Sequence, residues 1–146
     1  MTPEDEEYRR GMQKLVREML SVTDSVWHAP ALPKELRELA GSIHKDVREI
    51  ERVRVPKFKP KTGVTHKEAA AQYKEQKTRA ARKRIAQKTD KFATLVKKSP
   101  KYNSAEFKCV GDYEQCQEHR GKGDIHCRFA YFICMAKKII PFVRQK

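Results

Sequence analysis

The stretch that decides the fold contains four cysteines with symmetric spacing. Residues 109–134 read CVGDYEQCQEHRGKGDIHCRFAYFIC, which gives the pattern C-x6-C-x10-C-x6-C. Seven residues turn an α-helix through about 700°, so the two cysteines of each pair share one helix face and lie about 10.5 Å apart. Gly121 can end a first helix that opens near Asn103, and Asp124 can cap a second that runs to about residue 140. Residues 102–146 are therefore predicted to form an antiparallel helical hairpin.

The cysteine positions in this hairpin indicate how they pair. The sums 109 + 134 and 116 + 127 are both 243, so Cys109 should face Cys134 and Cys116 should face Cys127. Of the three pairings that four cysteines allow, only this nested one suits the hairpin. Between the two cysteine pairs, Tyr113 and Tyr131 should meet on the same seam. Further apolar residues should dock the hairpin onto the other helices: Phe107, Val110, Ile125, Phe129, Phe132, Ile139 and Ile140.

Two alternatives to disulfides Cys109–Cys134 and Cys116–Cys127 remain open. Buried free cysteine is common, so all four thiols could be reduced core residues. A zinc site at the hairpin tip could use Cys116, His119, His126 and Cys127. One zinc ion on all four cysteines is excluded, because its sulfur ligands must lie within roughly 4 Å of each other. Disulfides would indicate an oxidising compartment, such as the mitochondrial intermembrane space or the periplasm, and free thiols the cytoplasm or nucleus.

The paired cysteines resemble those of the twin-cysteine, coiled-coil-helix-coiled-coil-helix proteins of mitochondria. The resemblance covers residues 109–134 and is architectural, because that family usually has C-x9-C or C-x3-C where this chain has C-x6-C. It implies nested disulfides on two antiparallel helices. It also implies the role common in that family, a structural subunit or assembly factor of a larger complex.

The N-terminal part, residues 1–54, is predicted to form a second hairpin. Thr2 and Pro3 favour a helix start, and acidic residues fill the first turn. Apolar residues recur at helical spacing over residues 3–22 and 33–53. The two stripes should pack against each other across a connector at residues 23–32. Their members are Tyr8, Met12, Leu15, Met19 and Val22, then Leu36, Leu39, Ile43, Val47, Ile50 and Val53.

The middle of the chain is predicted to be a basic arm. Residues 55–64 contain two prolines and should form an extended basic linker. Thr65 and Glu68 make a capping box for a long helix within residues 65–101, which ends before Pro100. Its apolar stripe is thin, so we expect only residues 92–96 to dock and both hairpins to fold without the arm. The predicted fold is all-α.

Charge concentrates in this arm. The chain has a net charge of +14, and residues 1–51, 52–101 and 102–146 contribute 8 − 11 = −3, 17 − 3 = +14 and 8 − 5 = +3. Such a field favours a polyanionic partner, with nucleic acid as the leading candidate and no sign of base specificity. The predicted binding residues are Lys57, Lys59, Lys61, Lys74, Lys77, Arg79, Arg82, Lys83, Arg84, Lys88 and Lys91.

The sequence offers no sign of catalysis. The five histidines lack metalloprotease spacing, and no phosphate-binding loop, dinucleotide fingerprint or nucleophile elbow occurs. We therefore expect no enzyme and no cofactor. The longest apolar run is too short for the roughly 20 residues of a transmembrane helix. The leading hypothesis is a non-catalytic binding protein. The alternative is a structural subunit or assembly factor whose amphipathic helices meet protein partners.

Overall fold

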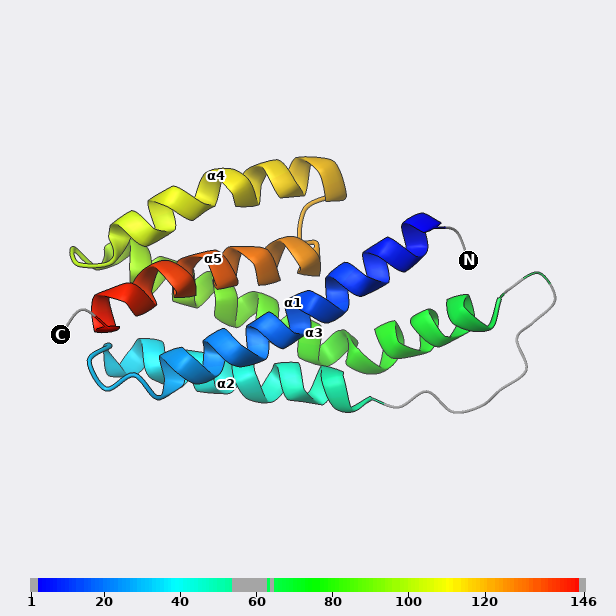
Figure 1. Ribbon diagram of the computed structural model, residues 1–146, viewed down its shortest axis with the longest axis horizontal. Helices are drawn as coiled ribbons and strands as arrows, with labels where there is room; N and C mark the ends of the chain where they lie inside the picture. Colours follow the sequence, from blue (N-terminus) through cyan, green and yellow to red (C-terminus); the bar gives the residue numbers. More distant parts are fainter. Residues whose placement is uncertain (1–2, 54–62, 64, 145–146) are drawn as a thin grey trace.

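The computed structural model describes residues 3–53, 63 and 65–144, which contain five helices and no strand. The helices are α1 (Pro3–Trp27), α2 (Lys34–Arg52), α3 (His66–Lys98), α4 (Asn103–Arg120) and α5 (Ile125–Arg144). Helices α1 and α2 form one antiparallel hairpin, and α4 and α5 form another (Figure 1). The predicted all-α fold is confirmed. Apart from residue 63, the predicted linker lies outside the described residues.

Local signals explain most helix boundaries. Thr65 accepts a hydrogen bond from the Glu68 amide, and the Glu68 carboxylate accepts one from the Thr65 amide, so the predicted capping box starts α3. The Asp124 carboxylate accepts hydrogen bonds from two amides in the first turn of α5. Gly121 ends α4 with a φ of 102°, a conformation that favours glycine.

Two helices run further than predicted. Helix α1 continues five residues past residue 22, through a polar segment that was expected to be a connector. The buried stripe of α1 continues through this segment, because Val22, Thr23 and Val26 are buried, and the Thr23 hydroxyl is satisfied by donating to the Met19 carbonyl. Helix α5 continues beyond Pro141 to Arg144. A proline removes one intrahelical hydrogen bond, which a helix can tolerate close to its end.

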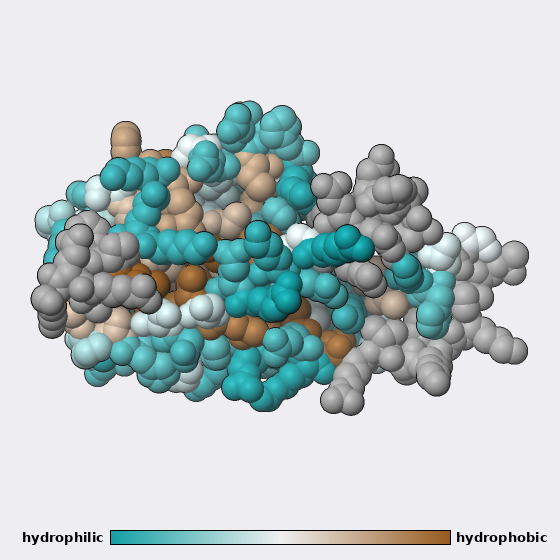
Figure 2. All heavy atoms as spheres, in the orientation of Figure 1, coloured by the Kyte–Doolittle hydropathy of each residue, from teal (hydrophilic) through white to brown (hydrophobic). Residues whose placement is uncertain are grey.

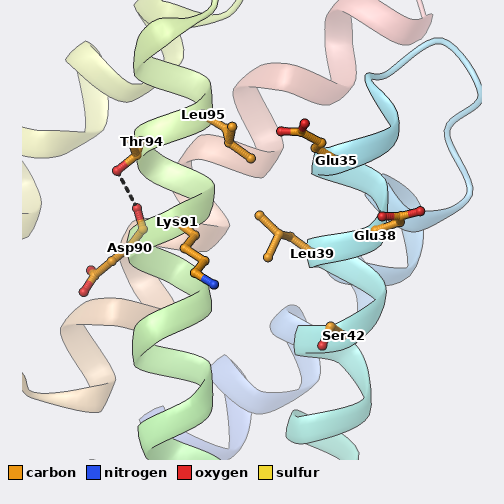
Figure 3. A pocket seen from close by; sticks show the side chains of 8 residues that line it. All are labelled: Glu35, Glu38, Leu39, Ser42, Asp90, Lys91, Thr94 and Leu95. Carbon is orange, nitrogen blue, oxygen red and sulfur yellow. Dashed lines mark hydrogen bonds between the residues drawn. The ribbon is translucent and has the colours of Figure 1, made fainter.

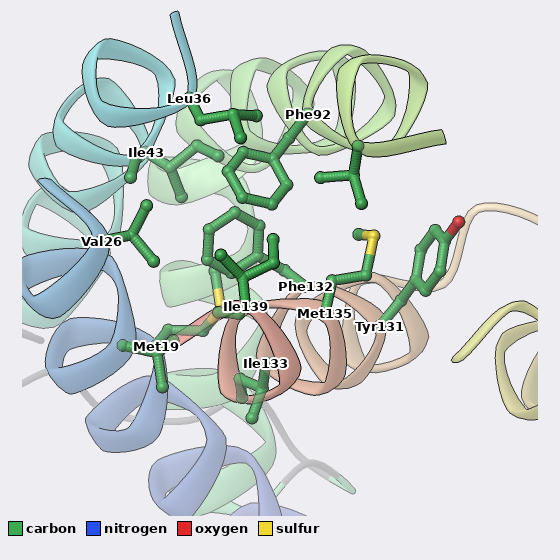
Figure 4. Close-up of a cluster of buried hydrophobic side chains, with 14 of the residues drawn as sticks. Met19, Val26, Leu36, Ile43, Phe92, Tyr131, Phe132, Ile133, Met135 and Ile139 are labelled. Atoms are coloured by element: carbon green, nitrogen blue, oxygen red, sulfur yellow. The ribbon is translucent and has the colours of Figure 1, made fainter. Parts of the chain in front are cut away.

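Four helices form a ring around a common core. Helix α1 contacts α2 and α5, and α3 also contacts α2 and α5, while α4 packs outside the ring against α3 and α5. Phe92 of α3 meets Phe132 of α5, with ring centroids 4.6 Å apart (Figure 4). Met19 and Ile43 bring α1 and α2 into the same cluster, and both are fully buried.

The basic helix is a wall of this core. Its buried residues recur at helical spacing along about five turns: Thr78, Ala81, Ile85, Thr89, Phe92 and Val96. The prediction that only residues 92–96 dock is therefore wrong. The expectation that both hairpins fold without the arm stays a prediction, and the packing argues against it, because removing α3 would expose the core side of α2 and α5. The buried stripe is longer than predicted because two of its members are threonines and one is alanine, which give a weak apolar signal in the sequence.

Most of the surface is polar. Figure 2 shows hydrophilic residues over most of the face drawn, with hydrophobic residues gathered in a band along its middle. Phe107 on α4 is 78% exposed and is the one large hydrophobic side chain so exposed among the described residues. The expectation that Phe107 docks the hairpin is therefore wrong, whereas Phe129 and Phe132 are buried as predicted.

The two predicted disulfides are present. Cys109 pairs with Cys134 and Cys116 with Cys127, with Cα–Cα distances of 5.9 and 5.6 Å. Both bonds join α4 to α5. Helix α4 otherwise buries only Ala105 and Glu106, so it has no large buried apolar side chain to anchor it. Its other apolar contacts with the core, Val110 and Tyr113, are only partly buried, so we expect the disulfides to supply much of its attachment.

A close contact between α1 and α2 gives a test of the packing. An alanine Cβ at Gly41 would lie 2.6 Å from Cε2 of the Trp27 indole. We expect Gly41→Ala to lower the free energy of unfolding by about 1–3 kcal/mol in urea denaturation, because the rigid ring must move. Gly111→Ala is the control: its Cβ meets nothing within 4 Å. It should raise stability by up to about 1 kcal/mol through helix propensity, so equal effects of the two substitutions would contradict this packing.

The disulfides give a second test. Cys109–Cys134 spans 25 residues and Cys116–Cys127 spans 11. By the chain-entropy model, each bond contributes roughly 3 kcal/mol to the free energy of unfolding. After reduction we expect the amides of α4 to exchange with solvent deuterium far faster, while those of α2 keep their protection. Hydrogen-exchange mass spectrometry on the reduced, alkylated chain measures this. Unchanged protection of α4 would show that its packing does not need the disulfides.

Candidate polyanion-binding surface

The eleven predicted binding residues do not form one surface. Lys57, Lys59 and Lys61 lie outside the described residues. The other eight lie on α3, and their side chains divide between the α2 side of the helix and its solvent-facing side.

Two of the eight hold α3 against α2. The Asp46 carboxylate of α2 accepts a hydrogen bond from Nε of Arg84 at 3.1 Å and another from Nζ of Lys88 at 2.6 Å. Arg84 also donates to Glu49 at 2.6 Å. The side chain of Asp46 is 7% exposed, so this carboxylate is largely removed from water. The hydrogen bond to Asp46 raises the pKa of Arg84 above its ordinary value. Arg84 and Lys88 are thus structural residues.

Two more have local partners on α3. Nη1 of Arg82 lies 3.8 Å from the Glu75 carboxylate, and Nζ of Lys77 lies 5.7 Å from the centroid of the Tyr73 ring. Lys77 and Glu75 are exposed, so these contacts leave Lys77 accessible and Arg82 partly neutralised. Contacts of this kind at an exposed site contribute little to stability.

Lys91 borders an open groove between α2 and α3. The groove has a volume of about 680 Å³, and Leu39 and Leu95 point into it from opposite sides (Figure 3). Glu35 and Glu38 of α2 supply negative charge on its other wall. Among its lining residues, the Thr94 hydroxyl donates to the Asp90 carbonyl of the same helix at 2.9 Å.

The solvent-facing side of α3 carries two pairs of exposed cations, which together we call the outer row. Counting about 100° per residue from Ile85 in the buried stripe, Arg79 and Lys83 point about 120° and 160° away. Lys97 and Lys98 point about 120° and 140° away. All four side chains are exposed and have no carboxylate partner among the described residues. Lys91 is also exposed, but it points about 120° away in the opposite sense, towards the groove against α2, and is not counted. The outer row is therefore Arg79, Lys83, Lys97 and Lys98.

Half of the outer row was missed in the sequence. Lys97 and Lys98 lie in the last turn of α3, where a positive charge is also favoured by the helix dipole. They follow Lys83 by 14 and 15 residues, which is about four turns, so helical periodicity could have placed them on the same side. Lys74 is also exposed and lies before the first buried residue of the helix, in turns that extend past α2 (Figure 1).

One carboxylate lies within the outer row, and it is already paired. Asp90 is positioned between Lys83 and Lys97 on the same side of α3. Nη1 of Arg128, on α5, donates to it at 2.8 Å and also donates to the Ala86 carbonyl at 3.1 Å. The side chain of Arg128 is 17% exposed, so it approaches Asp90 from the bundle side. This ion pair offsets the one negative charge that would repel an anion here.

The hairpin tip is not a metal site in this structure. Cys116 and Cys127 are joined to each other, so neither is a free thiolate for zinc. The described residues contain no cluster of three or more potential metal ligands. Burial lowers the pKa of His126, with a smaller contribution from Arg120. The zinc alternative of Cys116, His119, His126 and Cys127 is thus replaced by the disulfide.

Two tyrosines meet between the two disulfides, and one of them is hydrogen-bonded to a buried carboxylate. Tyr113 and Tyr131 stack with centroids 4.3 Å apart, as their matching positions predicted. The Tyr131 hydroxyl donates to the buried Glu106 carboxylate at 2.7 Å. Burial, followed by this hydrogen bond, raises the pKa of Tyr131 far above its ordinary value, so the hydroxyl keeps its proton. Burial likewise raises the pKa of Tyr113. Sequence reasoning did not single out Glu106 as the partner of Tyr131.

The contact between α2 and α3 yields a prediction. Asp46→Asn keeps the side-chain size but removes the charge that pairs with Arg84 and Lys88. We expect a loss of about 1–3 kcal/mol in the free energy of unfolding by urea denaturation. Glu49→Gln is the matched control, because Glu49 is 62% exposed and should matter by less than about 1 kcal/mol. If the control were as destabilising as Asp46→Asn, Asp46 would not be the anchor of α3.

Comparison with known proteins adds no relative to this geometry. None of the described helices is long and apolar enough to cross a membrane. No family model, no curated protein and no solved structure matches the chain.

Proposed function

We propose that the chain is a non-catalytic helical binding protein that binds a polyanion, nucleic acid above all, through the solvent-facing side of α3. The observation that carries the proposal is the division of charge on this helix. Arg84 and Lys88 are bonded to Asp46, whereas the four cations of the outer row are exposed without carboxylate partners among the described residues. Unpaired cations concentrated on one side of a rigid helix favour binding to a phosphate backbone.

The expected binding has a defined electrostatic character. Each phosphate neutralised on duplex DNA contributes about −0.9 to the slope of log affinity against log salt. Four residues of the outer row therefore account for a slope of about −3.6. Arginine adds planar donors that suit phosphate oxygens, and lysine adds a point charge. The exposed side chains described on α3 offer phosphate contacts but no evident means of reading base edges.

The disulfides bear on where this binding would take place. Disulfides persist in oxidising compartments, so we propose a location such as the mitochondrial intermembrane space or the periplasm. A nucleic acid or another polyanion in such a compartment would then be the partner.

A second function is supported by a separate observation. Phe107 is 78% exposed on α4, next to Gly111, whose position leaves open space beside the helix. An exposed aromatic side chain is a common anchor for a protein partner. This supports a role as a structural subunit or assembly factor, in which α4 meets a protein and α3 an anionic surface. Phe107→Ser would then reduce capture of a partner without changing retention on nucleic acid.

The first function predicts the effect of removing the outer row. Replacement of all four residues by glutamine should raise the dissociation constant for a nucleic acid at about 0.15 M salt by tenfold or more. The salt slope on duplex DNA should fall by three to four. Fluorescence anisotropy across a salt series measures both quantities. The variant is Arg79→Gln, Lys83→Gln, Lys97→Gln and Lys98→Gln.

The control variant removes four positive charges from helices other than α3. Four exposed cations lie on other helices: Arg10, Lys14, Arg17 and Lys138. Their replacement by glutamine changes the net charge equally but should change affinity by less than threefold. If both variants lost affinity equally, the binding would follow net charge alone and the proposed surface would be wrong. Asp90→Asn provides a test in the opposite direction, because it removes the carboxylate within the outer row and should tighten binding.

A further inference from the structure

The side chains that accompany the outer row narrow the choice of polyanion. Between Arg79 and Lys98, the positions on the solvent-facing side of α3 hold no aromatic residue and no large apolar residue. Tyr73, the nearest aromatic residue on α3, lies before the row, is half-buried and carries Lys77 over its ring. The side chains between the cations of the row are small or polar: Ala80, Gln87, Asp90 and Thr94.

The geometry of the outer row is fixed by the bundle. Buried residues from Thr78 to Val96 hold α3 along nearly the whole row, so the row cannot bend toward a ligand. At about 1.5 Å per residue the row is about 28 Å long, with Arg79 and Lys83 at one end and Lys97 and Lys98 at the other. The gap between Lys83 and Lys97 is about 21 Å. A ligand that contacts both ends must present phosphates over this length.

A single strand fits this surface poorly. Proteins that bind single strands offset the cost of ordering them by stacking bases on aromatic side chains, each worth about 1–3 kcal/mol. The outer row has cations but no stacking platform. A lipid surface also fits poorly, because interfacial helices insert large apolar side chains beside their cations. The solvent-facing side of α3 has none along the row.

A double helix suits both the positive charge of the outer row and its fixed geometry. Duplex DNA carries one negative charge per about 1.7 Å of its axis and holds its phosphates in place before binding. A straight, rigid row of cations can meet them without ordering either partner. The pairing of Asp90 with Arg128 offsets the one repulsive charge within the row.

From these observations we infer that the polyanion is a double-helical nucleic acid, which the outer row contacts through backbone phosphates without reading its bases. The inference rests on the proposed function and specifies its ligand. A duplex of DNA and one of RNA share the required chemistry, a rigid double row of phosphates, and the experiment distinguishes them.

The test compares labelled ligands by fluorescence anisotropy on the full, oxidised chain. The ligands are a DNA duplex of about 20 base pairs, an RNA duplex of the same sequence, a second duplex of scrambled sequence, and the separated strands. We expect each duplex to bind at least tenfold more tightly than its strands at about 0.15 M salt, and the two sequences to agree within threefold. The tighter of the DNA and RNA duplexes identifies the natural class.

Several outcomes would overturn the inference. Single strands that bind as tightly as the duplexes, a tenfold preference for one sequence, or binding to vesicles with anionic lipid but not to duplexes would each reject it. If single strands bind tightly and the glutamine variant of the outer row abolishes this, the proposed function stands and only the duplex inference fails. If no nucleic acid is retained, or that variant binds as the unmodified chain does, the proposed function fails as well.

Discussion

The rest of the structure depends on one buried carboxylate. Asp46 of α2 accepts hydrogen bonds from Arg84 and Lys88 of α3, with its side chain 7% exposed. A carboxylate in such a place is costly unless its partners are complete. Two cations of α3 must therefore meet it, one turn apart, and this sets both the rotation of α3 and its register along α2. That rotation places the remaining cations of α3 toward solvent.

In the proposed function the same helix would serve both stability and binding. Its buried stripe brings Ile85, Phe92 and Val96 into the core shared with α2 and α5. A cationic segment that could detach would lose charge density, since its side chains would spread over many conformations. Fixed on the bundle, the cations of the outer row keep one spacing. Rigidity of this kind favours a partner whose own charges are already in place.

The helices and the cysteine pairing could be predicted because each rests on local periodicity. Equal sums of residue numbers sufficed to pair Cys109 with Cys134. The docking of α3 could not be predicted, because the apolar content of a stripe containing Thr78 and Thr89 is too weak to show. The candidate site was only partly predictable for a related reason. The sequence shows where the cations of α3 lie along the helix, but it does not show which of them bond to a buried carboxylate on another helix. The packing of α3 on α2 decides this, because it brings Arg84 and Lys88 to Asp46.

The disulfide hairpin reaches the candidate surface through α5. The Cys116–Cys127 bond and the Asp124 cap fix the first turn of α5, and Arg128 follows directly. From there its guanidinium reaches Asp90 and the Ala86 carbonyl on α3. A cation held at this place offsets the charge of the single carboxylate within the outer row. Through Arg128, the oxidised hairpin thus contributes to the electrostatics of the candidate surface, and this would couple stability to the proposed binding across the α3–α5 contact.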